Sequence, residues 1–116
     1  MINIRQSNIT IFVKNIDKAI NFYKGIGLIL KKRWDDHYAM LETTGITIGL
    51  HPAGKNMARA SSQVSIGFII DDIKEVKSLL SEKKIYYKEE YDKSGLYVHF
   101  NDLDGTYLYF TQPKWR

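Results

Sequence analysis

An internal repeat constrains this chain more than any other feature. Residues 7–23, "SNITIFVKNIDKAINFY", have the pattern of a strand followed by a capped helix, and residues 64–80, "VSIGFIIDDIKEVKSLL", repeat that order. The candidate helix caps Asn15 and Asp72 lie 57 residues apart. The later pairs drift only slightly, because Tyr38 and Tyr97 are 59 residues apart and Gly45 and Gly105 are 60 apart. Duplication followed by small loop insertions leaves such a drift, so we expect two modules of the same construction.

Each module is predicted to have the order β-α-β-β-β. Over 8–13, branched apolar residues at 9, 11 and 13 alternate with Asn8, Thr10 and Phe12, a period of two that is typical of a strand, and the helix after Asn15 has apolar residues at helical spacing. Strands are expected at 28–34, 38–42 and 46–51 in the first module. In the second module we expect a strand over 64–70, a helix over 73–80, and strands at 85–91, 96–100 and 106–110.

The sequence therefore predicts an α+β protein. Its modules span about 7–51 and 64–112, and a linker rich in Pro, Gly and small residues, 52–63, joins them within a single domain of residues 1–116. One helix covers only one face of a sheet. We expect the two sheets to form a cupped cleft with the helices outside.

Composition narrows the class of protein. The chain has no cysteine, which removes disulfides, thiolate metal sites and a cysteine nucleophile, and suits a reducing, cytoplasmic compartment. No signal peptide is recognisable and no apolar run reaches the ~20 residues of a membrane span. The net charge is +4, but the lysines are interleaved with acids and no nucleic-acid motif accompanies them. We expect neither nucleic acid nor membrane as a partner, and the residual charge favours an anionic small ligand.

The order of these segments resembles the vicinal oxygen chelate superfamily, which includes glyoxalase I, extradiol dioxygenases, fosfomycin-resistance enzymes and bleomycin-resistance proteins. The resemblance runs from Ile9 to Phe110 through "ITIFVKNIDKAINFYKGIGL", "GITIGLHP", "GFIIDDI" and "FNDLDGTYLYF". It implies that relatives with a metal hold it by a histidine opening the first strand of each module and a glutamate late in the last strand.

Those four places hold Asn8, Gly49, Ser65 and Tyr109 in this chain. Divalent metals in such sites need imidazole or carboxylate donors, which none of the four supplies. We therefore expect no metal and no other cofactor, and we expect metal-dependent glyoxalase or dioxygenase chemistry to be absent. A displaced metal site using His51 and His99 is the alternative.

Strand alternation predicts which side chains line the cleft. The expected ligand-binding face is rich in aromatic rings with polar tips, and two glycines, Gly49 and Gly67, are expected to leave room between them. In the opposing interpretation the tyrosines fill the cleft by packing against the partner sheet. The predicted ligand-binding residues are Asn8, Trp34, Tyr38, Gly49, His51, Ser65, Tyr97, His99, Tyr107 and Tyr109.

Among the histidines, His99 is the best single candidate for acid–base chemistry or ligand contact, because alternation places it on the cleft face, and His51 is a further candidate to protonate a ligand anion. His51 precedes Pro52 at a strand end, and His37 follows "WDD" in an expected exposed turn. Arg33 is a further candidate for a polar contact to the ligand.

By its resemblance to the bleomycin-resistance branch, the protein is expected to bind a small organic molecule without a metal, as drug or metabolite sequestration, and to form a homodimer. The alternative is a glyoxalase- or dioxygenase-like enzyme, a lyase or isomerase with non-standard or no metal ligands. A regulatory or interaction module is a third class.

Overall fold

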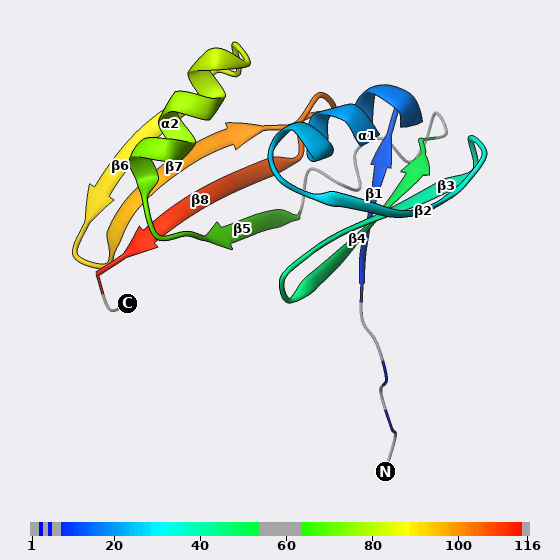
Figure 1. The fold of residues 1–116 in the computed structure, drawn as a ribbon, viewed down its shortest axis with the longest axis horizontal. Helices are drawn as coiled ribbons and strands as arrows, with labels where there is room; N and C mark the ends of the chain where they lie inside the picture. The colour runs from blue at the N-terminus through cyan, green and yellow to red at the C-terminus, as the bar shows by residue number, and fades with distance from the viewer. Residues whose placement is uncertain (1–2, 4, 6–7, 54–63, 115–116) are drawn as a thin grey trace. The chain divides into compact units, whose positions relative to one another are not determined.

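A computed structural model describes residues 3, 5, 8–53 and 64–114 (Figure 1). The chain divides into two compact units, residues 1–61 and 62–116. Each unit has one sheet of four strands and one helix, so the chain is an α+β protein built from β-α-β-β-β modules. Within the described residues, neither helix is long and apolar enough to cross a lipid bilayer.

The first unit contains β1 (Ile9–Val13), α1 (Ile16–Gly25), β2 (Ile29–Trp34), β3 (Tyr38–Thr43) and β4 (Ile46–Pro52). Its sheet has the order β1-β4-β3-β2, in which β1 and β4 are parallel and the other pairs are antiparallel. Helix α1 contacts β2, β3 and β4.

The second unit repeats this plan with β5 (Ser65–Ile69), α2 (Ile73–Glu82), β6 (Lys88–Asp92), β7 (Gly95–Asn101) and β8 (Tyr107–Pro113). Its sheet has the order β5-β8-β7-β6, with β5 parallel to β8. Helix α2 contacts β7 and β8.

Strand pairing confirms the alignment of the two modules. Thr10 pairs with Gly49 as Gly67 pairs with Tyr109, and Met40 pairs with Gly49 as His99 pairs with Tyr109. Gly49 and Tyr109 are therefore equivalent, as the family resemblance implied. Each unit has its own apolar core, formed by alternate strand residues that are almost completely buried: Ile11, Leu41, Ile48 and Leu50 in the first, and Ile66, Val98, Phe100 and Leu108 in the second.

Both helices begin at the predicted caps. The Asn15 side-chain oxygen accepts a hydrogen bond from the Lys18 amide, and the Asp72 carboxylate accepts one from the Lys74 amide, each at 2.9 Å. The Ile73 amide at the start of α2 donates to Gln112 Oε1 at 2.8 Å. Side chains thus satisfy amides that have no partner inside the helix.

Removing the second cap should lower stability without affecting the site. Asp72→Ala is expected to reduce the free energy of unfolding by about 1 kcal/mol, because the Lys74 amide loses its acceptor. Urea denaturation followed by circular dichroism measures this. Asp72→Asn keeps a capping oxygen and should retain most of the stability, so equal losses in both variants would show that the cap is not the cause.

Several boundaries differ from the sequence-based expectation by one to three residues, as where β8 ends at Pro113 and not at residue 110. The strand expected at 85–91 is β6, Lys88–Asp92, and Tyr86 is 79 % exposed. The reason is that residues after α2 end the helix: Lys84 has φ +59°, and the Ile85 amide donates to the Leu80 carbonyl at 2.8 Å. Strand β4 continues through Pro52, which pairs with Val13, although Pro52 was assigned to the linker. The rest of that predicted linker, from residue 54, lies outside the described residues.

Candidate functional site

The predicted ligand-binding residues lie on two sheet faces, one in each unit. Strand residues facing the helix are the buried core, and because side chains alternate along a strand, their neighbours lie on the opposite face. The first-sheet face carries Asn8, Trp34, Tyr38, Gly49 and His51, and the second-sheet face carries Ser65, Tyr97, His99, Tyr107 and Tyr109.

The Tyr38 hydroxyl is the centre of the first-sheet face. It lies 3.1 Å from Thr10 Oγ1 and accepts a hydrogen bond from Asn8 Nδ2 at 3.3 Å. A Cβ atom added at Gly49 would lie less than 3 Å from this hydroxyl. The hydroxyl therefore fills the space that a side chain at position 49 would need.

The remaining residues of the first-sheet face surround Tyr38. The Trp34 ring lies 5.6 Å from the Tyr38 ring, and the His51 ring lies 6.4 Å from it. His51 Nδ1 is 2.8 Å from the Pro52 carbonyl oxygen, to which it can only donate. His51 is exposed at the end of β4, and this local bond occupies one of its nitrogens.

Four aromatic side chains form a continuous cluster on the second-sheet face. The His99 ring stacks between Tyr97 and Tyr107, with centroid distances of 5.9 and 5.6 Å and interplanar angles of 11° and 17°. Tyr109 lies 6.2 Å from His99 and covers Gly67, where an added Cβ would approach its ring to less than 3 Å. All four rings are half-buried, so the cluster is both packed and accessible.

The expectation that the two glycines leave open space is wrong. A tyrosine ring from the same sheet covers each of them, Tyr38 over Gly49 and Tyr109 over Gly67. Glycine is used at both positions because the tyrosine rings pack directly against the strand. The sequence showed that positions 49 and 67 have no side chain, but it did not show which neighbouring side chain fills the space above each glycine.

His99 makes two hydrogen bonds that join three strands. Its Nε2 lies 2.7 Å from Glu90 Oε1 on β6, and its Nδ1 is hydrogen-bonded to the Tyr107 hydroxyl on β8. Burial raises the pKa of Tyr107 above its ordinary value, with smaller contributions from Tyr109 and Glu90. Tyr107 therefore keeps its proton at neutral pH, and the bond is between a neutral phenol and the imidazole.

A second polar chain orients Tyr97. The Tyr97 hydroxyl is 2.5 Å from Ser94 Oγ, which donates to the Asp92 carboxylate at 2.6 Å. The Ser94 side chain and then its backbone amide hold the pKa of Asp92 below its ordinary value. Asp92 is thus an ionised acceptor that fixes the turn and, through it, the Tyr97 ring.

Arg33 contributes to neither face as a free cation. It forms ion pairs with Asp17 at 2.7 Å and Asp36 at 2.8 Å. The hydrogen bond to Asp17 raises the pKa of Arg33 despite an opposing effect of burial. Because both carboxylates compete for the guanidinium, Arg33 is a weaker candidate for ligand contact than the sequence suggested.

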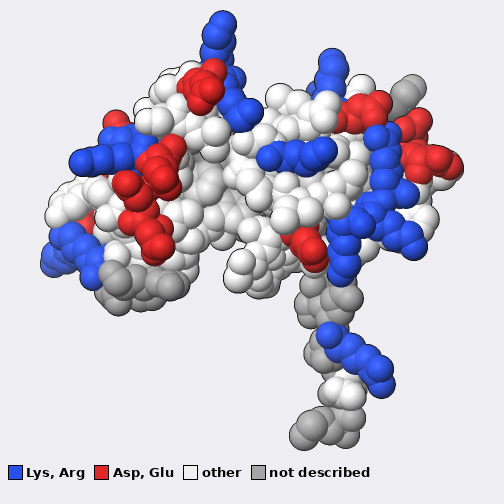
Figure 2. Space-filling model, in the orientation of Figure 1, with Lys and Arg blue, Asp and Glu red and all other residues white. Residues whose placement is uncertain are grey.

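The net positive charge does not lie on the unit with the aromatic cluster. Residues 8–53 contain six Lys and Arg against four Asp and Glu, whereas residues 64–114 contain seven against nine. Figure 2 shows basic side chains in a long run over the first unit, and acids interspersed with bases over the second. Charge alone therefore gives no preference for an anionic ligand on the second-sheet face.

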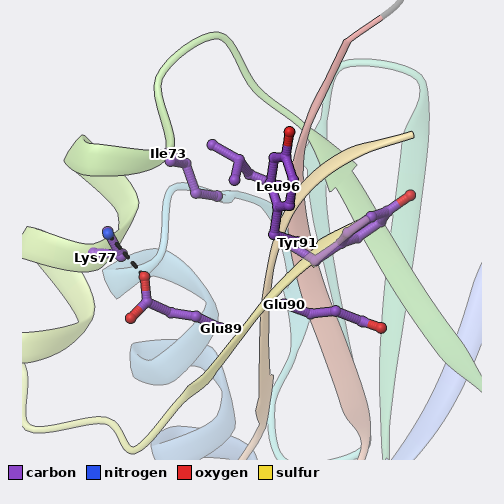
Figure 3. A pocket seen from close by; sticks show the side chains of 7 residues that line it. Ile73, Lys77, Glu89, Glu90, Tyr91 and Leu96 are labelled. Carbon is purple, nitrogen blue, oxygen red and sulfur yellow. Dashed lines mark hydrogen bonds and ion pairs between the residues drawn. The ribbon is translucent and has the colours of Figure 1, made fainter. Parts of the chain in front are cut away.

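A pocket of about 300 Å³ lies between α2, β6 and β7, on the helix side of the second sheet (Figure 3). Ile73 and Leu96 provide apolar walls, and Tyr97 reaches it from the second-sheet cluster. Lys77 on α2 forms an ion pair with Glu89 at 2.8 Å, which raises the pKa of Lys77. This lysine is therefore a charged structural partner and not a neutral nucleophile.

The donor chemistry does not fit a resident divalent metal. Asn8 is engaged with Tyr38 and Thr10, Gly49 has no side chain, and Ser65 and Tyr109 offer hydroxyl oxygens in place of imidazole or carboxylate donors. Among residues 8–53 and 64–114, no group of three or more His, Asp or Glu side chains is placed to hold a metal ion. The "DLDG" segment is a turn in which Asp102 Oδ1 accepts from the Asp104 and Thr106 amides, each at 2.8 Å.

Sequence reasoning missed Glu90 as the partner of His99. Glu90 stood in a run, "KEEYDK", that was treated as an exposed charged surface. The available signal was the two-residue turn between Asp92 and Gly95. Counting back from that pair places Glu90 opposite Tyr97, on the same face as His99.

The two β-α-β-β-β modules carry polar and aromatic side chains on the sheet faces that lie away from the helices. Comparison with known protein families identifies the class of protein that has this construction. The model of the Glyoxalase/Bleomycin resistance protein/Dioxygenase superfamily matches residues 5–110. The chain belongs to this superfamily. No curated protein sequence matches it significantly.

Solved structures with the same fold include resistance and antibiotic-binding proteins. The fosfomycin resistance protein FosX from Listeria monocytogenes is 19% identical, with a TM-score of 0.80 and coverage of 98% of this chain and 96% of that one. The antibiotic-binding protein TnmS3 from Streptomyces sp. CB03234 is 19% identical, with a TM-score of 0.77 and coverage of 97% and 100%. A bleomycin-binding protein complexed with bleomycin is 20% identical, with a TM-score of 0.73 and coverage of 96% and 100%. At these identities the likeness shows the fold alone.

Proposed function

We propose that the protein binds a small organic molecule non-covalently on the second-sheet face and acts by sequestering a drug or metabolite, without a resident metal. The observation that carries this proposal is the half-buried cluster of Tyr97, His99, Tyr107 and Tyr109. Exposed aromatic rings with hydrogen-bonding tips supply stacking area and a few directional polar contacts, which is how proteins bind flat organic ligands.

The family setting supports the same proposal. Proteins of this fold that bind bleomycin and other antibiotics are among its structural relatives. Imidazole and carboxylate donors are absent from the four places where relatives with a metal hold it, which favours binding over metal-dependent turnover. Asn8, Trp34, Tyr38, Gly49 and His51 on the first-sheet face are proposed as further ligand contacts.

The proposal extends to the setting in which the protein works. We propose a cytoplasmic protein whose two modules act as one domain, which forms a homodimer, and whose partner is a small molecule, not a nucleic acid or a membrane. The absence of cysteine supports the compartment, and the family resemblance supports the dimer. The interleaving of lysines with acids, without a nucleic-acid-binding motif, supports the partner class.

A thermal-shift screen tests the binding function. Antibiotics, including bleomycin, and planar aromatic metabolites are added to the purified protein, and at least one is expected to raise the melting temperature, because a ligand that binds only the folded state stabilises it. Tyr109→Ala should reduce that gain, whereas Leu103→Ala, in an exposed turn, should leave it unchanged. A screen in which no compound shifts the wild-type transition would contradict the proposal.

A second candidate function is a lyase or isomerase that works without a metal. The hydrogen bonds of His99 to Glu90 and Tyr107 favour it, because a carboxylate, an imidazole and a hydroxyl in series are the elements of general acid–base catalysis. Turnover of a bound compound, lost in His99→Phe, would replace sequestration by this function.

A further inference from the structure

The hydrogen bonds of the Glu90–His99–Tyr107 chain fix the tautomer of a neutral His99. An ionised carboxylate only accepts, so His99 Nε2 carries a hydrogen and donates it to Glu90. In the neutral imidazole Nδ1 is then an acceptor, and the Tyr107 hydroxyl donates to it. The Tyr107 oxygen keeps lone pairs that this bond does not use. It is therefore able to accept a hydrogen bond from a ligand.

We propose that Glu90, His99 and Tyr107 form a proton relay that takes the proton of a ligand hydroxyl, so that the site selects planar phenols or enols and binds them as oxyanions. This inference rests on the proposed binding function and names its ligand class. The ligand O–H bond breaks and its proton moves to the Tyr107 oxygen, while the Tyr107 proton moves to His99 Nδ1. The products are a ligand oxyanion and an imidazolium paired with Glu90. Charge is conserved and no other reactant is needed.

The groups around His99 suit this transfer. Glu90 is adjacent to it and stabilises the imidazolium, as a carboxylate does beside a catalytic histidine. Lys88 is the cross-strand neighbour of His99 on β6, and opposite residues of an antiparallel pair share a face, so its ammonium charge favours an oxyanion there. The other titratable groups on this face, within the described residues, are Tyr97, Tyr107, Tyr109 and Asp92, whose carboxylate is joined to the Tyr97 hydroxyl through Ser94.

The surroundings also explain why the ligand should be planar. The rings of Tyr97, His99 and Tyr107 are nearly parallel, so they offer their edges and outer faces to a flat ring. The side chain of His99 is 24% exposed, which leaves this part of the cluster accessible while it is shielded from most of the solvent. Partial shielding strengthens the charge–charge interactions that stabilise the product.

The test uses 4-nitrophenol, whose phenolate absorbs visible light. The wild-type protein is titrated with it across a pH series, and the bound probe should ionise at lower pH than the free probe, by about one pKa unit or a tenfold change in the ionised fraction. His99→Phe keeps an aromatic ring and should bind the probe without that shift. Glu90→Gln should reduce the shift, and Glu89→Gln, which faces Lys77 instead, is the matched control that should retain it.

A measurement without ligand checks the relay itself. Nitrogen NMR of His99 should show a protonated Nε2 and a bare Nδ1 in the wild type, and Glu90→Gln should weaken that preference. Wild-type protein that binds 4-nitrophenol with unchanged ionisation, or binds other compounds but no phenol, would overturn the relay and leave the proposed function standing. Failure of every compound in the thermal-shift screen would instead remove the proposed function.

Discussion

Gly67→Ala is expected to weaken ligand binding on the second-sheet face about two- to tenfold, or ~0.5–1.5 kcal/mol. Gly67 pairs with Tyr109, and an added Cβ would lie less than 3 Å from the Tyr109 ring carbons and hydroxyl. The ring must rotate away, because the β5 backbone is held by its pairing with β8. The rotation removes one of four clustered rings, and each aromatic contact is worth about 0.5–1.5 kcal/mol beyond its area.

The experiment compares Gly67→Ala with a matched change in the other module. Binding of the compound that gives the largest thermal shift is measured by calorimetry for both variants and the wild type. Gly49→Ala displaces the Tyr38 hydroxyl from its contacts with Asn8 and Thr10 in the same way. A larger loss in Gly67→Ala than in Gly49→Ala is expected if the second-sheet face carries most of the binding, whereas a larger loss in Gly49→Ala would overturn that choice.

Much of the fold was predictable because the same order of strands and helix occurs twice in the sequence, so each module supported the assignment of the other. The caps Asn15 and Asp72 follow from the repeat, the equivalence of Gly49 with Tyr109 was implied by the family resemblance, and the structure confirms both. Strand β6 was placed too early because "IYY" has high strand propensity, yet Ile85 is needed to end α2. Local hydrogen bonding at a helix end outweighed propensity there.

The site was predictable as a set of faces but not as a set of contacts. Side chains alternate along a strand with a period of two, and this period alone was enough to predict that His99 and the tyrosines share one face. The hydrogen-bond partners of His99 depend on the register of β6 and β8 against β7. They also depend on side-chain rotamers, which the alternation of residues does not specify. Glu90 was missed for the first reason, and the covering of Gly67 by Tyr109 for the second.

Leu108→Ala is expected to lower the free energy of unfolding by about 2–5 kcal/mol, the largest stability effect among the changes proposed for this chain. Leu108 is fully buried and pairs in register with Ile66 and Phe100, which are both 2% exposed. Few groups can move into the space it leaves, because Phe110 is stacked on Phe100 beside it. Leu103→Ala is the control, since Leu103 is 60% exposed and should cost little.

Leu108→Ala also tests whether stability and ligand binding are independent. Alternate side chains of β8 pack in the core, and the side chains between them lie on the proposed ligand-binding face. Leu108 faces the core, whereas Tyr107 and Tyr109 on either side of it belong to the second-sheet face. At a temperature where Leu108→Ala is still folded, its ligand affinity should stay within about twofold of the wild type, while urea denaturation shows the lost stability. If affinity falls in proportion to stability, the tyrosines are held in place by core packing, and their strand pairing alone does not define the site.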